Sequence, residues 1–423
     1  MTNSDVYREV KTWKKPIHAS RTLLARNYLK LLPNLEIIGI TGSVGKTLTQ
    51  NAIFSVLSQK FRVVVGDENL DPTFRIPQTI LASKPWHQKL ILEYGVEHPH
   101  DMDHYLSLVR PKIVVVTAIA PTHTKYFKNQ EGVYLEKVKL VRALAKNDIA
   151  VLNADDPYVV KMADETHAKV WWYGRKAQGL TAHSRSAPGR NFAHSGSETG
   201  SGVVKISHFS QNLKGSKFRL HYNGQKASVS TKIIGKHQLT SVYAAATVGI
   251  ICNLTLKQIA KGLSTAKPPE HRLNLIVTKN TRIIDDTYNA SPKAAIESVN
   301  TLLDLGKRQK KIAVFGEMKD LGKFSQEAHE LVGLKIAKSK IQSLVTIGRT
   351  ASTIANVAQK NGFDGEIINL DTTRDAIEKI KKIKTTNSLI LVKGSRHAHL
   401  ERIVYGLLGK STQVNCYHCG ELE

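Results

Sequence analysis

The residues best suited to chemistry lie in a short loop near the start of the chain. The apolar segment Leu35–Thr41 predicts a strand, and apolar residues at helical spacing predict a helix over Leu48–Gln59. The loop between them reads Gly42-Ser43-Val44-Gly45-Lys46-Thr47. Its two glycines let backbone N–H groups converge on a phosphate, and the helix N-terminus adds partial positive charge. Lys46 would reach the terminal phosphates of a nucleotide, and the Thr47 hydroxyl would bind Mg²⁺.

The loop departs from the usual phosphate-binding pattern at one position. Gly-x-x-x-x-Gly-Lys would open with a glycine, and this chain has Ile40 there. A chance Gly-Lys-Thr in a surface loop is the alternative. We favour the phosphate loop because a predicted strand and a predicted helix flank it.

Other apolar segments predict the sheet that positions this loop. Short runs rich in Val and Ile recur between segments of helical length, which is typical of a parallel sheet with crossover helices. The remaining strands of this sheet are expected at Arg62–Gly66, Leu90–Glu93, Ile113–Thr117, Ile149–Asn153 and Val170–Tyr173. The fold class is therefore α/β.

The sequence changes character after Tyr173. Residues 182–202 are rich in Gly, Ser and His and predict a mobile loop insertion. Three β-prone runs predict a small antiparallel sheet: Val203–Ile206, Phe218–Tyr222 and Ala227–Ile233. Helices are expected over Gln238–Cys252 and Thr255–Ser264.

A second α/β domain is predicted beyond Lys267-Pro268-Pro269, which breaks the helical pattern. Its strands are expected at Arg282–Asp285, Ile312–Phe315, Leu344–Ile347, Glu366–Leu370 and Leu389–Val392. The expected organisation is a short N-terminal extension over 1–34, an ATP-binding central domain over 35–268 and a Rossmann-like C-terminal domain over 269–423.

Composition narrows the classes of protein. The chain has 423 residues, 41% of them hydrophobic, which is enough for two or three globular domains of about 100–200 residues each. We expect no integral membrane segment, because no run approaches the roughly 18 apolar residues of a span, and the charged start lacks a secretory signal. A cytoplasmic location is the default.

The chain carries a large positive net charge. The 61 basic and 35 acidic residues give a net charge of +26, which attracts polyanions. Nucleic acid is not the expected partner, because the basic residues are spread along the chain instead of forming one patch with aromatic residues.

Three cysteines suit a reducing compartment. Cys416 and Cys419 lack a second cysteine pair to complete a zinc site, so a frayed tail is expected.

Several motifs together resemble the Mur ligase family. The loop Ile40–Thr47 resembles its variant phosphate loop, and the other matching segments follow in the family's order. These segments are Asn69 with Ile76-Pro77, Glu93-Tyr94-Gly95, Pro121-Thr122-His123, Glu136–Lys139, Asn153–Asp155, His271–Leu273, Asp285–Pro292, Gly316–Met318 with Leu321-Gly322, and Lys393–Arg396. The strings Asp-Asp-Thr-Tyr-Asn-Ala-Ser-Pro and Val-Lys-Gly-Ser-Arg resemble the branch that adds D-alanyl-D-alanine to a UDP-muramoyl-tripeptide.

The resemblance implies an ATP-dependent ligase that joins a carboxylate to an amine through an acyl phosphate. Such a reaction needs neutralised charge and positioning, and no protein nucleophile. Lys46 and Thr47 would hold the phosphates and the first of two Mg²⁺ ions. By the resemblance, Glu93 and His123 are further metal ligands, and Lys137 is the lysine that CO₂ carbamylates to hold the second ion. Lys139 is the alternative to Lys137.

The resemblance also assigns residues in the second domain. Arg272 would contact nucleotide phosphates, Asp286 would accept from the ribose, and Tyr288 would pack near the adenine. The face that receives the amine would include Asn289, Lys393, Ser395 and Arg396.

Two features depart from the family pattern. A substantial N-terminal domain that binds UDP is usual, but only Met1–Asn34 precede the first strand, so a UDP-muramoyl peptide held differently, a lipid-linked one or another carboxylate is expected as the acceptor. In Gly235–Ser241, Gln238 and Ser241 replace two asparagines, one of which faces adenine in the family. Both side chains can still form hydrogen bonds.

The alternatives left open are a related ligase acting on another acid and amine, such as a folyl-polyglutamate-type enzyme, and a basic ATPase that binds nucleic acid. The string Asp285–Pro292 argues against the folyl type. A monomer is expected.

Overall fold

The computed structural model describes residues 14–66, 72–122, 124–179, 202–319, 321–410, 414–416 and 420–422. Some predictions concern residues outside these ranges: Asn69, His123, nearly all of the insertion expected at 182–202, and Cys419. The side chain of Cys416 is not described either. The described chain divides into two compact units. Unit 1 contains the residues up to Phe209 with Lys217–Thr231 and Gln238–Lys267, and unit 2 contains Ser210–Ser216, Lys232–His237 and the residues from Pro268.

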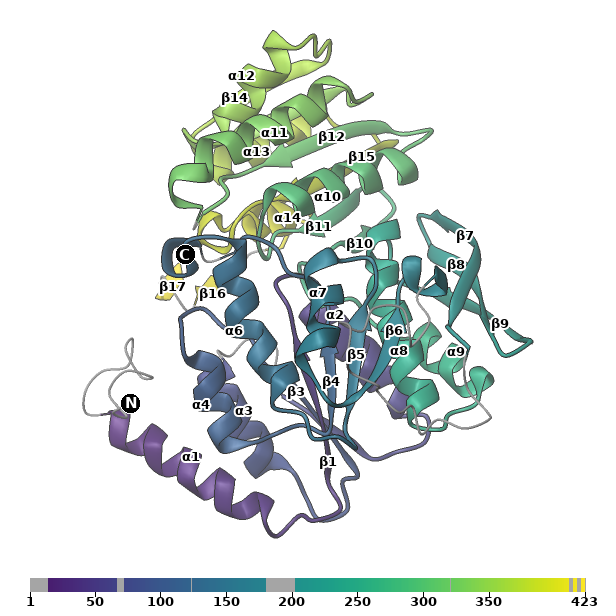
Figure 1. Ribbon diagram of the computed structural model, residues 1–423. Helices are drawn as coiled ribbons and strands as arrows, with labels where there is room; N and C mark the ends of the chain where they lie inside the picture. Colours follow the sequence, from purple (N-terminus) through teal and green to yellow (C-terminus); the bar gives the residue numbers. More distant parts are fainter. Residues whose placement is uncertain are drawn as a thin grey trace. The chain divides into compact units, whose positions relative to one another are not determined.

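Unit 1 is built on a six-stranded parallel sheet, as the sequence predicts (Figure 1). In spatial order its strands are β2 Val63–Val65, β3 Lys89–Glu93, β1 Glu36–Thr41, β4 Ile113–Val116, β5 Ile149–Asn153 and β6 Lys169–Tyr173. The central strands are buried on both faces, which explains their unbroken Ile, Val and Leu runs. β1 lies between β3 and β4, so the carboxyl ends of these three strands meet at one edge.

Helices cover both faces of this sheet. They are α1 Lys15–Leu29, α2 Lys46–Leu57, α3 Pro72–Ala82, α4 Asp101–Leu108, α5 Thr124–Phe127, α6 Gln130–Arg142, α7 Pro157–Lys161, α8 Leu239–Ile251 and α9 Leu256–Thr265. Residues of α3, α4, α6 and α7 share one core with alternate residues of β3, β4 and β5. The helices α2 and α8 pack on the opposite face, and α9 packs against both (Figure 1).

A separate small sheet has three strands, β7 Lys205–Asn212, β8 Gly215–Tyr222 and β9 Gln225–Thr231. Its first strand begins two residues later and ends six residues later than the pattern predicts. His208 has a φ of +53°, which interrupts the regular alternation along β7.

Unit 2 contains a mixed six-stranded sheet. In spatial order its strands are β10 Asn274–Val277, β11 Arg282–Asp286, β15 Ser388–Lys393, β12 Lys310–Phe315, β13 Ser343–Ile347 and β14 Glu366–Leu370. Five strands are parallel, and β10 pairs with β11 in the antiparallel direction. The sequence predicted all of these strands except β10.

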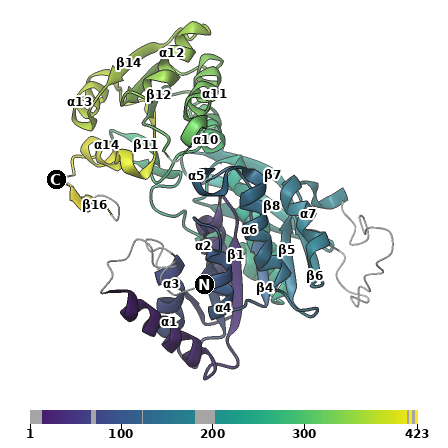
Figure 2. The same cartoon turned by 60° about the vertical axis from the view of Figure 1, so that its left-hand side comes forward.

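Five helices flank the sheet of unit 2 (Figure 2): α10 Pro292–Leu305, α11 Ser325–Ala337, α12 Ser352–Lys360, α13 Thr373–Ile383 and α14 Glu401–Leu407. The first three share one core with one face of the sheet, and the last two share a second core with the other face. The short strands β16 Val414–Cys416 and β17 Gly420–Leu422 pair with each other. No helix among the described residues is both long and apolar enough to cross a membrane.

Candidate active site

The phosphate loop begins where β1 ends and closes at the first turn of α2. Gly42 has a φ of +140°, and a Cβ atom there would lie 2.0 Å from Thr117 Oγ1, so only glycine fits. Gly45 has a φ of +84° and precedes α2 directly. Both glycines that the sequence singled out are therefore required by the backbone path.

Hydrogen bonds to the segment after β4 hold the loop in place. The Ser43 N–H donates to the Ala118 carbonyl at 2.7 Å. The Ser43 hydroxyl donates to the Ala120 carbonyl and accepts from the Ala120 N–H, both at 3.0 Å. The residue that precedes α2 is Gly45, which has no side chain to cap the helix. The N-terminus of a helix carries partial positive charge and is a favourable place for an anion.

Glu93 stands at the centre of a charged cluster beside this loop. Its carboxylate accepts a hydrogen bond from the Thr47 hydroxyl at 3.2 Å and lies 3.8 Å from the Lys46 ammonium. Lys46 Nζ also donates to the Gly42 carbonyl at 3.0 Å. Three residues predicted from sequence, on β3 and α2, are therefore brought together at the carboxyl edge of the sheet, where ligands of open α/β sheets bind.

Arg75 is a member of this cluster that the sequence did not predict. Its guanidinium lies 3.4 Å from the Glu93 carboxylate, and the residue is 5% exposed. It comes from α3 and directly precedes Ile76-Pro77, a pair already singled out as a motif. That proximity was the one available signal, because nothing in the spacing of Arg75 relates it to Glu93.

Lys137 lies on α6 with its side chain buried, at 2% exposure. Burial lowers its pKa well below the usual value, and the positive charge of Lys46 lowers it further, against the opposing effects of Glu93, Glu136 and Asp101. These charges place Lys137 within electrostatic reach of the loop cluster. The shift is towards the uncharged amine, which is the form that reacts with CO₂.

Lys139, the alternative, has different surroundings. Its ammonium donates to Asp103 at 2.7 Å and to Glu136 at 2.9 Å, and the side chain is partly exposed. It is thus a partly exposed cation that pairs with the exposed Asp103 and with the buried Glu136. Two residues apart on a helix, the two lysines point in different directions, and the geometry favours Lys137 over Lys139 as the modified residue.

The described residues contain no group of three or more His, Cys, Asp or Glu side chains arranged to hold a metal ion. Magnesium does not require such a cage, because it keeps several waters and takes its other ligands from one or two carboxylates and from substrate phosphates. The Thr47 hydroxyl and the Glu93 carboxylate fit that requirement. The placement of His123 stays a prediction.

The departure at Gln238 and Ser241 has a partial structural explanation. Ser241, on α8, is 4% exposed, and its hydroxyl accepts from the Thr49 hydroxyl on α2 at 2.9 Å. It therefore fixes the helix that carries the phosphate loop. Gln238 Oε1 is buried and accepts no hydrogen bond from the described residues, which leaves it available to a ligand donor.

In unit 2, Asp286 lies at the end of β11 and is surrounded by donors. It accepts from Lys393 Nζ and from Ser298 Oγ, each at 2.6 Å, and from the Leu273 N–H at 3.2 Å. Lys393, at 1% exposure, also donates to the Asn289 carbonyl at 2.9 Å. Asp286 and Lys393 are thus brought together as a buried ion pair that fixes the turn after β11.

Two guanidinium groups share the face of one aromatic ring in unit 2. Arg272 lies 3.8 Å and Arg396 lies 5.5 Å from the centre of the Tyr288 ring. The neighbours of Arg272, His271 and Leu273, have φ values of +59° and +53°, a strained path for side chains of this size. This turn sets the direction of Arg272, and the predicted residues Arg272, Tyr288 and Arg396 form one group.

The remaining predicted residues of unit 2 differ in exposure. Asn289 is exposed, and its side-chain carbonyl accepts from the Ala290 N–H at 2.8 Å. Ser395 is 2% exposed, and its hydroxyl has no partner among the described residues. Asn289 can therefore contact a bound molecule directly, whereas Ser395 needs a group that reaches a buried oxygen.

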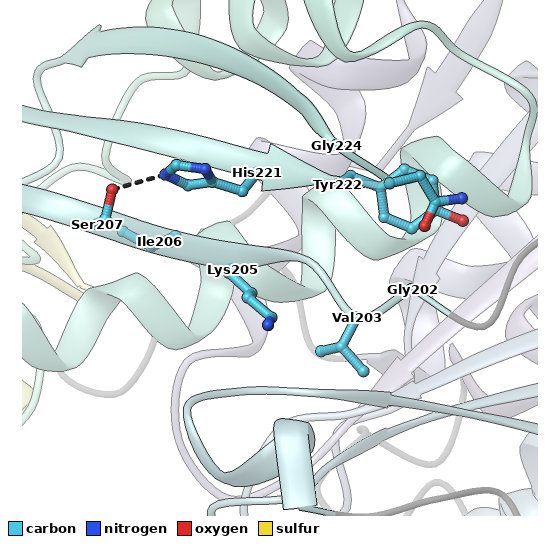
Figure 3. Close-up of a pocket in the computed structure, with 9 residues that line it drawn as sticks. Gly202, Val203, Lys205, Ile206, Ser207, His221, Tyr222 and Gly224 are labelled. Atoms are coloured by element: carbon cyan, nitrogen blue, oxygen red, sulfur yellow. Dashed lines mark hydrogen bonds between the residues drawn. The ribbon is translucent and has the colours of Figure 1, made fainter.

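A hollow of about 670 Å³ lies elsewhere, on the small sheet of unit 1 (Figure 3). It is lined by Gly202, Val203, Lys205, Ile206, Ser207, His221, Tyr222, Asn223 and Gly224. Ser207 and His221 join across it through a hydrogen bond of 2.6 Å. Its lining includes none of the site residues that the sequence analysis predicts.

Comparisons with known proteins agree with the motifs. The family model of the Mur ligase middle domain matches residues 40–249, and that of the Mur ligase glutamate ligase domain matches residues 271–396. The chain is 29% identical to the UDP-N-acetylmuramoyl-tripeptide–D-alanyl-D-alanine ligase of Bacillus subtilis (strain 168) over 389 residues, which covers 91% of this chain and 78% of that protein. It is 30% identical over 376 residues to the ligase of the same name from Buchnera aphidicola subsp. Baizongia pistaciae (strain Bp), covering 89% of this chain and 76% of that protein.

A solved structure shares the fold. A crystal structure of MurF from Acinetobacter baumannii superposes with a TM-score of 0.79 at 23% identity, covering 93% of this chain and 81% of that one. The predicted α/β architecture is thereby confirmed. On the matched domains, the relatives and the fold, the chain belongs to the Mur ligase family of ATP-dependent ligases that form amide bonds.

Proposed function

We propose that this ligase adds D-alanyl-D-alanine, or a similar amine, to the terminal carboxylate of a UDP-muramoyl-tripeptide in the synthesis of peptidoglycan precursors. The carboxylate oxygen attacks the γ-phosphorus of ATP, the bond to the β,γ-bridging oxygen breaks, and ADP leaves. The amine nitrogen then attacks the acyl carbon of the acyl phosphate and loses a proton. A C–N bond forms as the bond to phosphate breaks.

The cluster around Glu93 is the observation that carries this proposal. The reaction brings an anionic carboxylate towards an anionic phosphate, so the protein must supply positive charge at that place. Lys46, Arg75 and the N-terminus of α2 supply it, and Glu93 lies within 4 Å of both cations. Gln238 Oε1, buried without a described donor, fits the amino group of adenine.

Magnesium and a modified lysine complete the proposed site. Thr47 and Glu93 would hold Mg²⁺ together with substrate phosphates, and His123 and a carbamylated Lys137 would hold a second ion. Two such ions would neutralise charge on the phosphates during transfer. Lys137 itself fits carbamylation, because burial lowers the pKa of its amine, and the deprotonated amine can form an N–C bond to CO₂ with loss of a proton. The product is an anion beside the cation Lys46.

Residues of the second domain are proposed to contact the nucleotide and the amine. Arg272 is proposed to bind nucleotide phosphates, Asp286 to accept from the ribose and Tyr288 to pack near adenine, while Asn289, Lys393, Ser395 and Arg396 shape the amine side. Because Asp286 already accepts three hydrogen bonds, a ribose hydroxyl would have to add to that set. We keep 1–34, 35–268 and 269–423 as the proposed domain limits, and a cytoplasmic location as the proposed site of the reaction.

The test is phosphate release from ATP in the presence of Mg²⁺ and bicarbonate. UDP-muramoyl-tripeptide and D-alanyl-D-alanine are added separately and then together, and the product is identified by mass. Release that requires both substrates, with a muramoyl-pentapeptide as product, is the expected result.

Other outcomes would redirect the assignment. Release with another acid and amine pair would leave the ligase chemistry in place and change the substrates. ATP turnover with neither substrate would count against the proposed reaction as a whole. The names of the relatives from Bacillus and Buchnera favour the D-alanyl-D-alanine pair as the first to try.

A further inference from the structure

The outer side of α1 exposes large apolar side chains. Among the described residues, four of the five most exposed large hydrophobic side chains lie in this one short segment. They are Leu31 at 71%, Leu24 at 62%, Leu23 at 60% and Ile17 at 52% exposure. Single exposed leucines are ordinary on protein surfaces, but a concentration of them on one helix and the turn that follows it indicates a contact with another apolar surface.

The packing of α1 leaves this side uncovered. Its inner residues Ala25, Tyr28 and Leu29 join the core that contains α3 and α4, and the Tyr28 hydroxyl donates to the Ser83 carbonyl beyond α3 at 2.9 Å. Ile17 and Leu24 are seven residues apart and so point to the same side of the helix. Figures 1 and 2 both show α1 lying along the outside of α3. We call Ile17, Leu23, Leu24 and Leu31 the α1 surface.

Positive charge flanks the α1 surface. Residues 14–32 contain five cations, Lys14, Lys15, Arg21, Arg26 and Lys30, and no Asp or Glu. Arg21, Arg26 and Lys30 form no ion pair with any residue that the structure describes. A partner that covers the leucines should therefore carry negative charge close to at least these three cations.

We propose that the α1 surface docks on an anionic lipid bilayer, with α1 lying in the plane of the headgroups. A helix that presents leucines between lysines and arginines gains from both the acyl chains and the anionic headgroups. A second copy of this chain fits less well, because pairing two α1 surfaces would bring together two segments with five cations each. Nucleic acid would attract the cations but would leave the leucines in water.

The experiment measures binding of the full chain to vesicles by co-sedimentation. Vesicles of 70% phosphatidylcholine and 30% phosphatidylglycerol are compared with vesicles of phosphatidylcholine alone. The test variant is Leu23→Ser with Leu24→Ser, and its matched control is Leu331→Ser with Leu334→Ser, which alters two exposed leucines of α11. All four substituted side chains are exposed, so each variant should keep the thermal midpoint of the parent.

A second pair of variants tests the charges. Arg21→Gln with Arg26→Gln is compared with Lys217→Gln and Arg219→Gln, which removes the same charge from exposed positions on β8. Each cation near an anionic membrane contributes about fivefold to binding, so the α1 pair should weaken binding by about twenty-five-fold and the β8 pair far less.

The expected result is binding to the anionic vesicles only, weakened at least about tenfold by the Leu23 and Leu24 substitutions and unchanged in the α11 control. Binding that survives the leucine substitutions would show that diffuse net charge is responsible and would overturn the proposal. Absence of vesicle binding by the parent chain would also overturn it. So would a dimer in the absence of lipid that the leucine substitutions convert to monomer, because a second copy would then occupy the surface.

Discussion

Two charged clusters, one in each unit, differ in how closely their cations approach the carboxylate. Around Glu93, the two cations lie 3.4 and 3.8 Å away. Around Asp286, Lys393 and Ser298 each donate at 2.6 Å. The first, which we call the open cluster, pairs its charges at longer distances, whereas the second, the closed network, pairs them through short hydrogen bonds.

From this difference we infer what each cluster contributes to turnover and to stability. Cations held at a distance from a carboxylate retain much of their attraction for an anion, so the Glu93 cluster is arranged for ligand binding and chemistry. A buried pair with short hydrogen bonds has no such surplus and instead fixes the turn that carries Tyr288 and Asn289. Substitutions in the first cluster should therefore change turnover, and substitutions in the second should change stability.

The largest effect is expected from Lys137→Ala. Loss of the proposed metal-binding anion should lower the turnover number by about 10²–10³-fold or more, since charge stabilisation at a reacting phosphate is worth that much. The fold should persist, because Glu93 keeps its ion pairs with Lys46 and Arg75, and Glu136 keeps its pair with Lys139. Phosphate release gives the rate, and thermal unfolding reports the fold.

Lys139→Ala is the matched control for that variant. It removes a lysine from the same helix and breaks its pair with the exposed Asp103, which is worth about 0–1 kcal/mol. It also removes the cation from Glu136, whose buried carboxylate keeps a hydrogen bond from the Met102 N–H. Its turnover should stay close to that of the parent. Equal activity of the two variants would contradict the assignment of Lys137.

Lys393→Met should produce the largest loss of stability. It leaves the buried Asp286 carboxylate without its cation, and breaking one partner of a buried pair costs about 3–5 kcal/mol. Lys319→Met, which breaks the more exposed pair with Glu317, is the control and should cost about 0–1 kcal/mol. Denaturant unfolding of both variants measures the difference, and similar costs would mean that the Asp286 network is not closed.

The sequence predicted every strand of the two six-stranded sheets except the edge strand β10. Buried parallel strands such as β4 and β5 are continuous apolar runs, and their limits were predicted to within one residue. β10 was missed because it is a four-residue strand of half-buried residues at the edge of the sheet, with no run to mark it. Its position depends on pairing with β11, which no local pattern encodes.

The candidate site likewise has parts that a local sequence pattern predicts and parts that depend on tertiary packing. The phosphate loop is contiguous, so glycine spacing and flanking elements sufficed to predict it. Arg75 contacts Glu93 from 18 positions away along the chain, through tertiary packing alone. The resemblance to the family suggested Lys137, but only the burial of one lysine and the surface pairing of the other distinguish it physically from Lys139.

A smaller effect is expected at the helix behind the phosphate loop. Thr49→Val and Ser241→Ala each remove one member of a buried hydrogen bond of 2.9 Å between α2 and α8. In a double-mutant cycle the coupling between them should be about 1 kcal/mol. This bond joins α2 to α8 and is not itself proposed to contact ATP. Each substitution should therefore lower the free energy of unfolding and change the Michaelis constant for ATP little. A coupling near zero would show that Ser241 does not anchor α2.

The smallest effect concerns pH and the closed region of unit 2. Burial disfavours the charged form of His271, but its hydrogen bond to Asp285 at 2.8 Å and the negative charges of Asp285, Glu401 and Glu270 outweigh burial and raise its pKa above the usual 6.5. A raised pKa in the folded state means that protonated His271 stabilises the protein fully below about pH 6.5, and that this contribution is lost as the pH rises through the folded-state pKa. Titration of the His271 ring by NMR should show the raised pKa, and the stability difference between the parent and Asp285→Asn should shrink over that window. A stability difference that is the same at pH 6 and pH 9 would mean that the bond is maintained by a neutral ring, and that charge contributes to the Glu93 cluster but not to this turn.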